Sequence, residues 1–391
     1  MPSPPSPRRV VILGATGSIG ESAAKVARAL PERMKIVGIS GHNNQQCLLE
    51  LAREFQPRAI STKDEASANT LLEALASVML TPTISYAEEG LLTLATLPEA
   101  DLVLVAIVGT TGLKPALAAL KAGKNLAVAS KEILVMAGEE IMKTAAHHGC
   151  HILPVDSEHN ALFQCLEGRD PATIRRLIIT CSGGPFRTTA ATELATVTPA
   201  MALCHPTWDM GPKITIDSAT LFNKGLEMIE AHHLFHIPME KIDVVVHPES
   251  IIHSMVEFVD GSILAHMSQN DMMFPIQCAV TYPDRVAGPC PFLDLPGIGA
   301  LHFEAPRHDV FPALRLARQA GAIGGTMPAV LNAANEKAVE LFLAGSIAFP
   351  DIWKYVEEAM ELIPYILQPT LGEIITADQA ARKVVLQLYK R

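Results

Sequence analysis

A short acidic segment, Asp156-Ser157-Glu158, follows the apolar run 151–155 and carries two carboxylates that could bind a cation. Asp156 and Glu158 are two residues apart, so on an extended chain both side chains point to the same side. Carboxylate oxygens that converge at the end of a strand suit a hard divalent cation such as Mg²⁺ or Mn²⁺. By itself the segment is equally well explained by Asp156 acting as the N-cap of a following helix.

A second segment places two hydrogen-bond donors beside a carboxylate. Asn223 and Glu227 are four residues apart and Lys224 and Glu227 are three apart, so all three share one face of a helix. Such a face could hold a phosphate and a metal ion as neighbours. The alternative is a lysine–glutamate pair on a solvated helix, which contributes only about 0.2–0.5 kcal/mol.

Two loops add candidate ligand contacts. In the segment 181–184, the backbone amides of a Ser-Gly-Gly turn could form an anion-binding nest, to which the Ser182 hydroxyl adds a donor. An ordinary turn at the end of a strand is the alternative. Trp208 and Met210 stand in a loop rich in glycine and proline, where they could cover a ligand as a lid or simply pack in the core. The histidine pairs 147–148 and 232–233 are interpreted as surface residues, not metal ligands.

Polar residues also follow the apolar run 125–129. Ser130, Lys131 and Glu132 would lie at the carboxyl edge of a parallel sheet, where doubly wound domains bind their ligands. Lys131 could reach a substrate oxygen. Glu132 could accept a hydrogen bond from a ribose or an amide.

The segment Gly14-Ala-Thr-Gly17-Ser-Ile-Gly20 lies between an apolar run and an expected helix. That context suits a dinucleotide pyrophosphate, which approaches a glycine-rich backbone and rests on the helix N-terminus. The spacing is looser than Gly-x-Gly-x-x-Gly, so a turn without a ligand stays an alternative. The next strand, 36–40, ends without the Asp or Glu that binds the ribose of NAD, which favours NADP. His42 could contact the additional phosphate or be an ordinary loop residue.

The order of apolar runs predicts which elements position these residues. Near-continuous apolar strands alternate with helices in the first part of the chain, which predicts a doubly wound parallel sheet. Its expected strands cover residues 10–13, 36–40, 59–61, 101–108, 125–129 and 151–155. The middle is expected to be α+β, with strands at 175–180, 213–216 and 243–246 and a hairpin over 256–266 that turns at Asp260-Gly261. A linker rich in proline and glycine then precedes four helices, which should form a bundle.

The expected architecture is therefore α/β, with an N-terminal doubly wound (Rossmann-like) parallel sheet, a central α+β catalytic domain and a C-terminal helical bundle. We expect a nucleotide-binding domain over 1–155 and a catalytic domain with a lid loop over 156–285. A linker over 286–308 should lead to the helical bundle over 309–391. Helices in that bundle are expected at 309–321, 328–344, 350–363 and 377–389.

Composition narrows the functional classes. The chain has 391 residues and a net charge of −10, which argues against a sequence-independent nucleic-acid partner. With 49% apolar and 18% charged residues it is not a disordered chain. No apolar run approaches the roughly 18 residues that span a bilayer, so no membrane association is expected. Seven cysteines without a Cys-x-x-Cys pair fit reduced thiols, and we expect a cytoplasmic protein.

Taken together, these segments resemble the 1-deoxy-D-xylulose 5-phosphate reductoisomerase family over nearly the whole chain. The resemblance is carried by GATGSIG, SKEILVMAGEE, LPVDSEHNALFQCL, CSGGPFR and NKGLEMIEAHHLF, and continues through HPESIIHSMVEFVDGSILA and PAVLNAANEKAVELF. It implies conversion of 1-deoxy-D-xylulose 5-phosphate into 2-C-methyl-D-erythritol 4-phosphate in the non-mevalonate isoprenoid pathway. In the family the carbon skeleton rearranges by retro-aldol cleavage and re-aldolisation, and the resulting aldehyde is reduced by NADPH. The resemblance also implies a divalent metal and a homodimer.

The resemblance assigns roles residue by residue. The metal ligands would be Asp156, Glu158 and Glu227. The substrate backbone would contact Lys131, Ser157 and Glu158. Its phosphate would contact Ser182, Ser218, Asn223 and Lys224. His205 would close over the site, and Trp208 and Met210 would belong to a lid. NADPH would contact Thr16, Gly17, Ser18, Ile19, Gly41, His42, Asn43, Ser130, Glu132 and Gly211.

The chain departs from the family pattern at His42, where the family often has Lys, and at Ser130, where it usually has Asn. The segment 268–274 also differs from the more typical Gly-x-Pro-Asp-Met-Arg. One alternative function is that of another NADP-dependent oxidoreductase, similar to aspartate-semialdehyde dehydrogenase, which would need an activated cysteine. The other is a non-enzymatic nucleotide-sensing module, which would not need the three acidic residues.

Overall fold

The computed structural model describes residues 6–205, 208 and 210–390. The chain divides into two compact units. The first comprises the chain up to Ile133 together with Glu140–Asn160 and Asp271–Pro291, and the second comprises Leu134–Glu139, Ala161–Asn270 and the chain from Phe292 onward.

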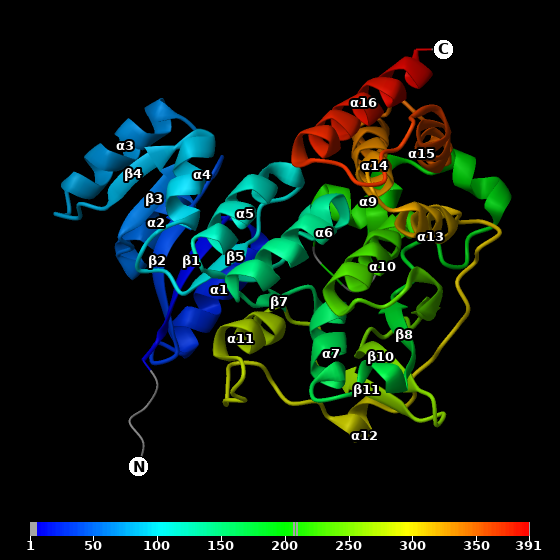
Figure 1. Ribbon diagram of the computed structural model, residues 1–391, viewed down its shortest axis with the longest axis horizontal. Helices are drawn as coiled ribbons and strands as arrows, with labels where there is room; N and C mark the ends of the chain where they lie inside the picture. The colour runs from blue at the N-terminus through cyan, green and yellow to red at the C-terminus, as the bar shows by residue number, and fades with distance from the viewer. Residues whose placement is uncertain (1–5, 206–207, 209, 391) are drawn as a thin grey trace. The chain divides into compact units, whose positions relative to one another are not determined.

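The first unit is built on a seven-stranded sheet in which every pair of neighbouring strands is parallel (Figure 1). The strand order is β4-β3-β2-β1-β5-β6-β7. The strands are β1 (Arg8–Leu13), β2 (Met34–Ser40), β3 (Ala59–Thr62), β4 (Thr83–Tyr86), β5 (Leu102–Val105), β6 (Asn125–Val128) and β7 (Ile152–Pro154). The expected doubly wound sheet is thus confirmed, although β4 was not predicted and β5 is shorter than the run 101–108.

Helices follow the strands of this sheet, as the alternating pattern predicts. They are α1 (Ser18–Ala29), α2 (Gln45–Phe55), α3 (Glu65–Ala76), α4 (Ala87–Ala95), the 3₁₀ turn η1 (Thr110–Gly112), α5 (Leu113–Lys121) and α6 (Lys131–His148). Helix α1 shows why they form: its buried residues are mostly small and apolar, and its polar residues face solvent. Ala137 interrupts α6 with a non-helical backbone conformation.

A distant part of the chain completes the first unit. Helix α11 (Met273–Thr281) packs against α1, and the guanidinium of Arg8 donates to the carbonyls of Ala279 and Tyr282 at 3.0 and 2.8 Å. An ion pair joins Arg33 to Asp284. The compact units therefore differ from the expected boundaries. Residues 271–285 come from the span 156–285 that was expected to be one domain, and residues 286–291 come from the expected linker.

The second unit contains a four-stranded mixed sheet with the order β11-β10-β8-β9. Its strands are β8 (Ile174–Cys181), β9 (Ile242–Val246), β10 (Ile252–Phe258) and β11 (Ile263–Met267). Strand β10 is antiparallel to β8 and β11, and β8 is parallel to β9. The predicted hairpin is confirmed, and its turn is closed by Ser262, whose backbone N–H donates to Asp260 at 2.9 Å.

The strand expected over 213–216 is wrong. These residues lie in α9 (Pro212–Thr220), which begins with Pro212 directly after the N-cap Gly211. Proline at the first helical position has a backbone angle that suits a helix, and its missing N–H would have no partner there in any case. The β-branched side chains of Ile214, Thr215 and Ile216 suggested a strand, but packing within the unit favours a helix.

The remaining helices enclose one core together with this sheet. They are α7 (Ser157–Leu166), α8 (Pro199–Ala202), α9, α10 (Phe222–Phe235), α12 (Leu295–Ile298), α13 (Ala313–Ile323), α14 (Met327–Leu343), α15 (Asp351–Leu362) and α16 (Leu371–Tyr389), with 3₁₀ turns η2 (Pro171–Thr173), η3 (Ala191–Thr196) and η4 (Met239–Lys241). Phe349 is fully buried and makes edge contacts with Phe186 and Phe342. The four predicted C-terminal helices are present, but they share a core with the sheet instead of forming a separate bundle. Among the described residues, no helix combines the length and apolarity needed to cross a membrane.

Candidate functional site

In the first unit, the glycine-rich turn lies where the sheet reverses its winding. Strand β1 has β2 on one side and β5 on the other, and Gly14 follows β1 with a φ of +95°. A Cβ at Gly14 would lie 2.5 Å from the carbonyl oxygen of Ala106, so only glycine fits between the two strand ends. Ligands of doubly wound sheets bind in the crevice at this position.

The N-terminus of α1 directly follows this turn and therefore lies at the same edge of the sheet. Gly17 is the N-cap and has no side chain to bond the first amides of the helix, which leaves this end suited to an anion. A Cβ at Gly20 would lie 2.3 Å from the carbonyl oxygen of Ala15, so this glycine allows the helix to pack closely on the turn. The expected cofactor residues Thr16, Gly17, Ser18 and Ile19 all lie here.

Sequence reasoning missed Ser40, the residue that joins this turn to β2. Its Oγ accepts a hydrogen bond from the N–H of Gly14 at 2.9 Å, and its carbonyl accepts one from Ala15 at 2.8 Å. His42 and Asn43, which follow it, are exposed, and the His42 Nδ1 lies 3.0 Å from the Asn43 side-chain oxygen. Gly41 is buried and donates its N–H to the carbonyl of Ser61. The position of Ser40, a hydroxyl residue at the end of a strand, was the feature of the sequence from which its role could have been predicted.

The residues after β6 and β7 meet at the carboxyl edge of the sheet. The Nζ of Lys131 lies 2.5 Å from Oδ2 of Asp156, and only 5% and 11% of these side chains are exposed. The two strands are neighbours, so their ends bring the lysine and the aspartate together. Ser130 is buried and donates its hydroxyl to the carbonyl of Ile107, and Glu132 is also buried. The predicted segment 130–132 and the acidic segment thus share one edge.

Asp156 also occupies the first position before α7. Its carbonyl accepts a hydrogen bond from the N–H of Asn160 at 2.8 Å, so the capping position and the charged contact to Lys131 coexist. Ser157 donates its hydroxyl to Oε2 of Glu158 at 2.6 Å. The first unit therefore presents two carboxylates and one ammonium group within four residues of a strand end.

In the second unit, an imidazole lies between two serine hydroxyls. The Nε2 of His205 is 3.2 Å from Oγ of Ser182 and 3.0 Å from Oγ of Ser218. The backbone N–H of Trp208 donates to the His205 Nδ1 at 2.9 Å, which assigns the ring proton to Nε2. Burial, with a smaller contribution from the charge of Lys224, lowers the pKa of His205 to about 4. The ring is therefore a neutral donor at neutral pH.

The Ser182 hydroxyl is held by its own turn. Gly184 donates its N–H to the Ser182 Oγ at 3.2 Å, and Gly183 and Gly184 both have left-handed backbones, with φ of +83° and +69°. A Cβ at Gly184 would lie 2.8 Å from the carbonyl oxygen of Ser218. Glycine at this position lets the turn pack directly on α9, which brings Ser182 and Ser218 together.

The predicted face of α10 is present and buried. The Nδ2 of Asn223 donates to Oε1 of Glu227 at 2.5 Å, and the Nζ of Lys224 donates to Oε2 at 2.8 Å. Glu227 is fully buried, and Asn223 and Lys224 are less than 10% exposed. The interpretation of these residues as a solvated surface pair is therefore wrong. Helices α9 and α10 meet at Leu221, a single residue with a φ of +65°.

A second buried carboxylate in this unit was not predicted as part of the site. Asp217, 1% exposed, receives the Nζ of Lys213 at 2.5 Å and the amide Nδ2 of Asn335 at 2.8 Å. Asp217 directly precedes Ser218, so these contacts hold the backbone in place beside the Ser218 hydroxyl. The spacing of Lys213 and Asp217, four residues apart, was the only signal in the sequence.

The expected lid lies partly outside the described residues, since 206, 207 and 209 are not among them. Trp208 and Met210 are both half-buried, and Gly211 is exposed at the start of α9. Among the histidine pairs, His147 and His148 are exposed as expected. The expectation of a surface position is wrong for His233, which packs against Gly138, and burial lowers its pKa to about 4.

A glycine-rich turn at the switch point of a doubly wound sheet is the architecture of nucleotide-dependent oxidoreductases. Comparison of the sequence with models of known protein families identifies the particular family. The family model of 1-deoxy-D-xylulose 5-phosphate reductoisomerase matches residues 10–138, that of its C-terminal domain matches 152–235, and a further DXP reductoisomerase C-terminal domain matches 267–384.

Relatives and solved structures agree with these matches. The chain is 48% identical to the 1-deoxy-D-xylulose 5-phosphate reductoisomerase of Pelotomaculum thermopropionicum over 98% of its own length and 99% of the relative, and 50% identical to that of Chlorobium chlorochromatii over 96% and 98%. The Zymomonas mobilis enzyme in complex with NADPH is 43% identical, with a TM-score of 0.91 over 98% of this chain and 99% of that one. A DOX-P reductoisomerase in complex with NADPH, fosmidomycin and magnesium is 40% identical, with a TM-score of 0.92 over 98% of both chains. The chain belongs to the 1-deoxy-D-xylulose 5-phosphate reductoisomerase family.

Proposed function

We propose that this chain catalyses the NADPH- and divalent-metal-dependent conversion of 1-deoxy-D-xylulose 5-phosphate into 2-C-methyl-D-erythritol 4-phosphate. Relatives that match almost the whole chain carry this activity in their names, and solved relatives were determined with NADPH and with magnesium. Within this chain, the observation that carries the proposal is the buried turn of α10, where Glu227 is held between Asn223 and Lys224. This turn combines a cation ligand with donors for an anion.

The metal ligands that we propose are Asp156, Glu158 and Glu227. Their oxygens are hard ligands of the kind that Mg²⁺ or Mn²⁺ prefers, and each carboxylate already has a polar partner that orients it: Lys131, Ser157, or Asn223 with Lys224. A divalent ion there would supply Lewis-acid polarisation of the substrate carbonyl.

The phosphate of the substrate is proposed to bind the hydroxyl groups of Ser182 and Ser218 in the second unit. Because the Nε2 proton of His205 points between Ser182 and Ser218, each hydroxyl can turn its own hydrogen toward an anion. Lys224 and Asn223 add a positive charge and an amide, and His205 itself stays neutral. Lys131 and Ser157 are proposed to meet the substrate backbone, and Trp208 and Met210 to cover it and exclude water.

NADPH is proposed to bind the first unit. Its pyrophosphate fits the turn at Gly14 and the start of α1, where a Cβ would fill the space. The adenosine side would reach the end of β2, where no carboxylate opposes the additional phosphate. The proposed contacts are Thr16, Gly17, Ser18, Ile19, Gly41, His42, Asn43, Ser130, Glu132 and Gly211.

The alternative of an enzyme similar to aspartate-semialdehyde dehydrogenase is not favoured. Such chemistry needs a cysteine with a lowered pKa. Burial raises the pKa of Cys47 and of Cys150, and that of Cys290 to about 11.

We also propose that the protein acts as a homodimer in the cytoplasm, in keeping with the family resemblance.

The decisive experiment follows NADPH absorbance when the purified protein meets 1-deoxy-D-xylulose 5-phosphate. NADPH should be consumed in the presence of Mg²⁺ or Mn²⁺, and consumption should stop when EDTA is added and resume with excess metal. The product should co-migrate with 2-C-methyl-D-erythritol 4-phosphate. Metal-independent consumption, or none under any of these conditions, would refute the proposed function.

A further inference from the structure

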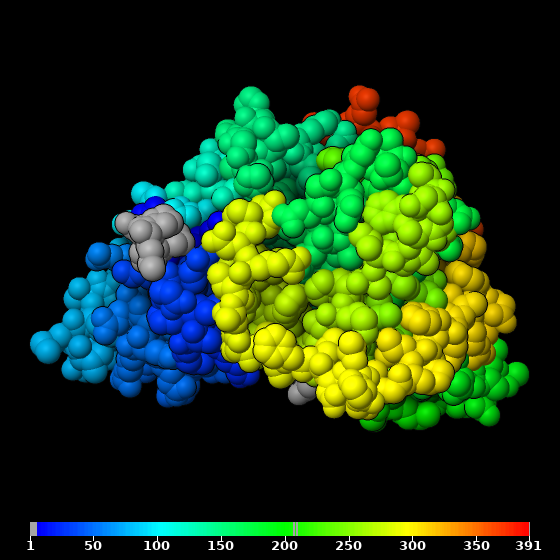
Figure 2. Space-filling view, turned by 90° about the horizontal axis from the view of Figure 1, so that it is seen from below, coloured from blue at the N-terminus to red at the C-terminus, as the bar shows by residue number. Residues whose placement is uncertain are grey.

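Residues 301–307, which we call the strap, lie along β9 of the second unit, an edge strand of its sheet. The sequence predicted only a linker here. The structure pairs Glu304 with Val246 through two backbone hydrogen bonds, both of 2.9 Å. Residues of the strap are largely exposed, and this part of the chain is drawn in yellow at the surface in Figure 2.

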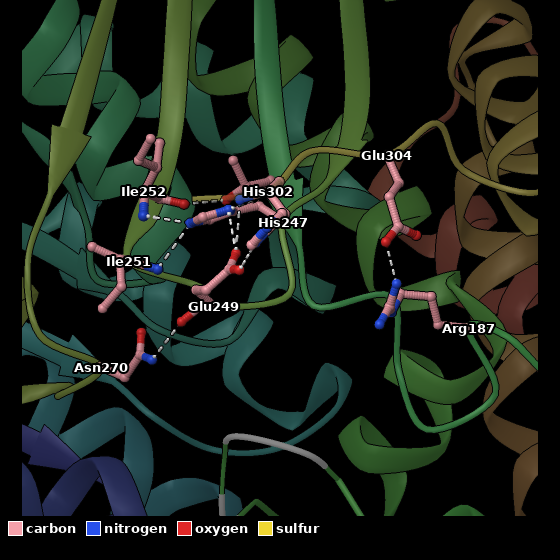
Figure 3. Close-up of polar contacts among 9 residues, drawn as sticks. Arg187, His247, Glu249, Ile251, Ile252, Asn270, His302 and Glu304 are labelled. Atoms are coloured by element: carbon pink, nitrogen blue, oxygen red, sulfur yellow. Dashed lines mark hydrogen bonds and ion pairs between the residues drawn. The ribbon is translucent and has the colours of Figure 1, made fainter. Parts of the chain in front are cut away.

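His247 connects the strap to the Ser182 turn. This histidine is fully buried and stacks on Phe303, with ring centroids 4.9 Å apart. Its Nδ1 is 2.9 Å from the carbonyl oxygen of His302, and its Nε2 accepts the backbone N–H groups of Ile251 and Ile252 (Figure 3). The backbone N–H of His247 donates to the carbonyl of Cys181 at 2.7 Å. Cys181 directly precedes Ser182, so strap and turn share one hydrogen-bonded path.

Glu249 fastens the other side of the strap. Its Oε1 lies 2.6 Å from the Nδ1 of His302, and its Oε2 accepts the backbone N–H of His302 at 3.2 Å. The same Oε2 is 3.1 Å from the His247 Nδ1. His302, two residues before Glu304 in the strap, is therefore held by both its backbone and its side chain.

Arg187 forms a second, more direct connection. Its guanidinium is ion-paired with Glu304 of the strap, as Figure 3 shows. Its aliphatic stem lies against the turn: a Cβ at Gly183 would come within 2.6 Å of the Arg187 Cδ and 3.0 Å of Val246 Cγ1. Arg307, at the end of the strap, donates to the carbonyls of Arg187 and Thr189 at 3.1 and 2.6 Å.

The turn is consequently held from two sides. Arg187 and Val246 contact Gly183 from the strap side, while Gly184 rests on the backbone of Ser218. Two consecutive glycines have many conformations available, so their position depends on such outside contacts. The Arg187–Glu304 pair is partly exposed, at 31% and 45%, and pairs of that kind contribute little to overall stability. Its effect should therefore fall mainly on the placement of the turn.

We propose that the strap positions the phosphate-binding turn, with Arg187 and Glu304 as positioning residues that act through Gly183 on the Ser182 hydroxyl. This inference rests on the proposed function in one respect, namely that the Ser182 turn receives the phosphate of the substrate. Arg187 itself does not contact the phosphate in this proposal, because its charge is directed at Glu304. The strap thereby becomes part of the specificity for a phosphorylated substrate.

The test compares Glu304→Gln and Arg187→Met with Glu357→Gln, a matched control. Glu357 forms a similar exposed pair with Arg315 at 2.7 Å in the same unit, away from the turn. The measured quantities are KM for the sugar phosphate, KM for NADPH, kcat, the inhibition constant of inorganic phosphate and Tm. For a displaced binding group we expect the sugar-phosphate KM and the phosphate inhibition constant to rise about three- to tenfold in both strap variants.

In these variants, KM for NADPH and Tm should match the control. The double variant should be no worse than either single variant, because both remove the same connection. Strap variants whose sugar-phosphate KM and phosphate inhibition constant stay within twofold of the Glu357→Gln values would overturn the proposal, as would a purely additive double variant. A merely structural role would instead lower Tm and leave the ratio of the two KM values unchanged.

The wild-type assay separates this proposal from the proposed function. If the wild-type protein does not consume NADPH with the sugar phosphate, the proposed function fails. The strap is then tested by titrating inorganic phosphate into the wild-type, Glu304→Gln and Glu357→Gln proteins and following its phosphorus NMR signal. Weaker binding in Glu304→Gln alone supports the strap, and equal binding in all three overturns it.

Discussion

The side-chain amide of Asn335, in α14, donates a hydrogen bond of 2.8 Å to the buried carboxylate of Asp217, in α9. The two residues are 118 positions apart in the chain. Asp217 precedes Ser218, so a helix of the C-terminal part of the chain orients a residue of the proposed phosphate site. Lys213 holds the other oxygen of the same carboxylate at 2.5 Å.

Replacing Asn335 by Leu should therefore weaken both stability and substrate binding. The change removes one donor from a buried charge, which costs about 1–3 kcal/mol of unfolding free energy. Urea denaturation measures this cost, and KM for the sugar phosphate should rise in parallel. Lys337→Ala, on the same helix but in a pair with the exposed Glu340, is the control and should change unfolding by no more than about 0.5 kcal/mol. Equal stability of the two variants would contradict the assigned role of Asn335.

Two half-buried histidines should make stability depend on pH. Burial is the main reason why the pKa values of His205 and His233 fall to about 4 in the folded protein, compared with about 6.5 when the chain is unfolded. Between these values the unfolded chain binds more protons, so the unfolding free energy should fall as the pH decreases from about 6.5 to about 4. Urea denaturation at several pH values in this window measures the slope.

The variant His205→Gln should flatten this dependence, since it removes one of the two groups. His148→Gln, which changes an exposed histidine, serves as the control and should keep the wild-type slope. A slope that is identical in the wild-type and His205→Gln proteins would show that His205 is not held neutral by burial.

The glycine-rich turn can be tested with a pair of alanine substitutions. Gly14 and Gly123 both have positive φ, but only at Gly14 would a Cβ meet another backbone atom, the carbonyl oxygen of Ala106. Gly123→Ala should lose about 1–2 kcal/mol from backbone strain and bind NADPH normally. Gly14→Ala should lose at least tenfold in NADPH affinity, because the turn must move. A fluorescence titration with NADPH decides the matter, and equal affinities would argue against a pyrophosphate at this turn.

Glu227→Gln should separate metal-dependent turnover from cofactor binding. The substitution keeps the shape and removes the charge that a cation requires, so kcat should fall by about a hundredfold or more. NADPH affinity should stay within twofold of the wild type. The control is Glu240→Gln, an exposed residue of the same unit, which should leave turnover unchanged. Normal turnover by Glu227→Gln would remove Glu227 from the proposed metal ligands.

Cofactor choice should depend on the charge at the end of β2. Introducing a carboxylate through His42→Asp would repel the additional phosphate of NADPH and offer an acceptor to the ribose of NADH. The ratio of kcat/KM for NADPH to that for NADH should fall about tenfold or more. Asn44→Ala, which removes the N-cap of α2, controls for local loosening and should not change the ratio. An unchanged ratio in His42→Asp would place the additional phosphate elsewhere.

Local signals in the sequence predicted much of the fold. The apolar run at Val10–Leu13 is a buried strand, and the hairpin expected over 256–266 is formed by β10 and β11. The helix at Pro212 was assigned to a strand because its isoleucine and threonine residues favour one locally. The placement of 271–291 in the first unit depends on contacts such as Arg8 with Ala279, which are 271 residues apart and leave no local pattern.

The residues of the candidate site likewise fall into two groups, those that local sequence predicts and those that depend on distant contacts. Glu227 with its two donors and the segment at Gly14 could be predicted because their spacing along the chain already describes their geometry. Ser40, the Asp217–Asn335 bond and the strap at Glu304 could not, since each acts through partners that only folding brings close. For the same reason the burial that lowers the pKa of His205 has no sign in its own neighbourhood in the sequence.

The single residue between α9 and α10 has a consequence for how this chain can vary. Leu221 alone separates the helix that carries Ser218 from the one that carries Asn223 and Lys224. One inserted or deleted residue there would rotate the second helix by about 100° relative to the first. The donors would then face away from the hydroxyls. The hairpin at Asp260-Gly261, by contrast, is exposed and can change in length, so this part of the chain can tolerate insertions at its surface but not at its helix junction.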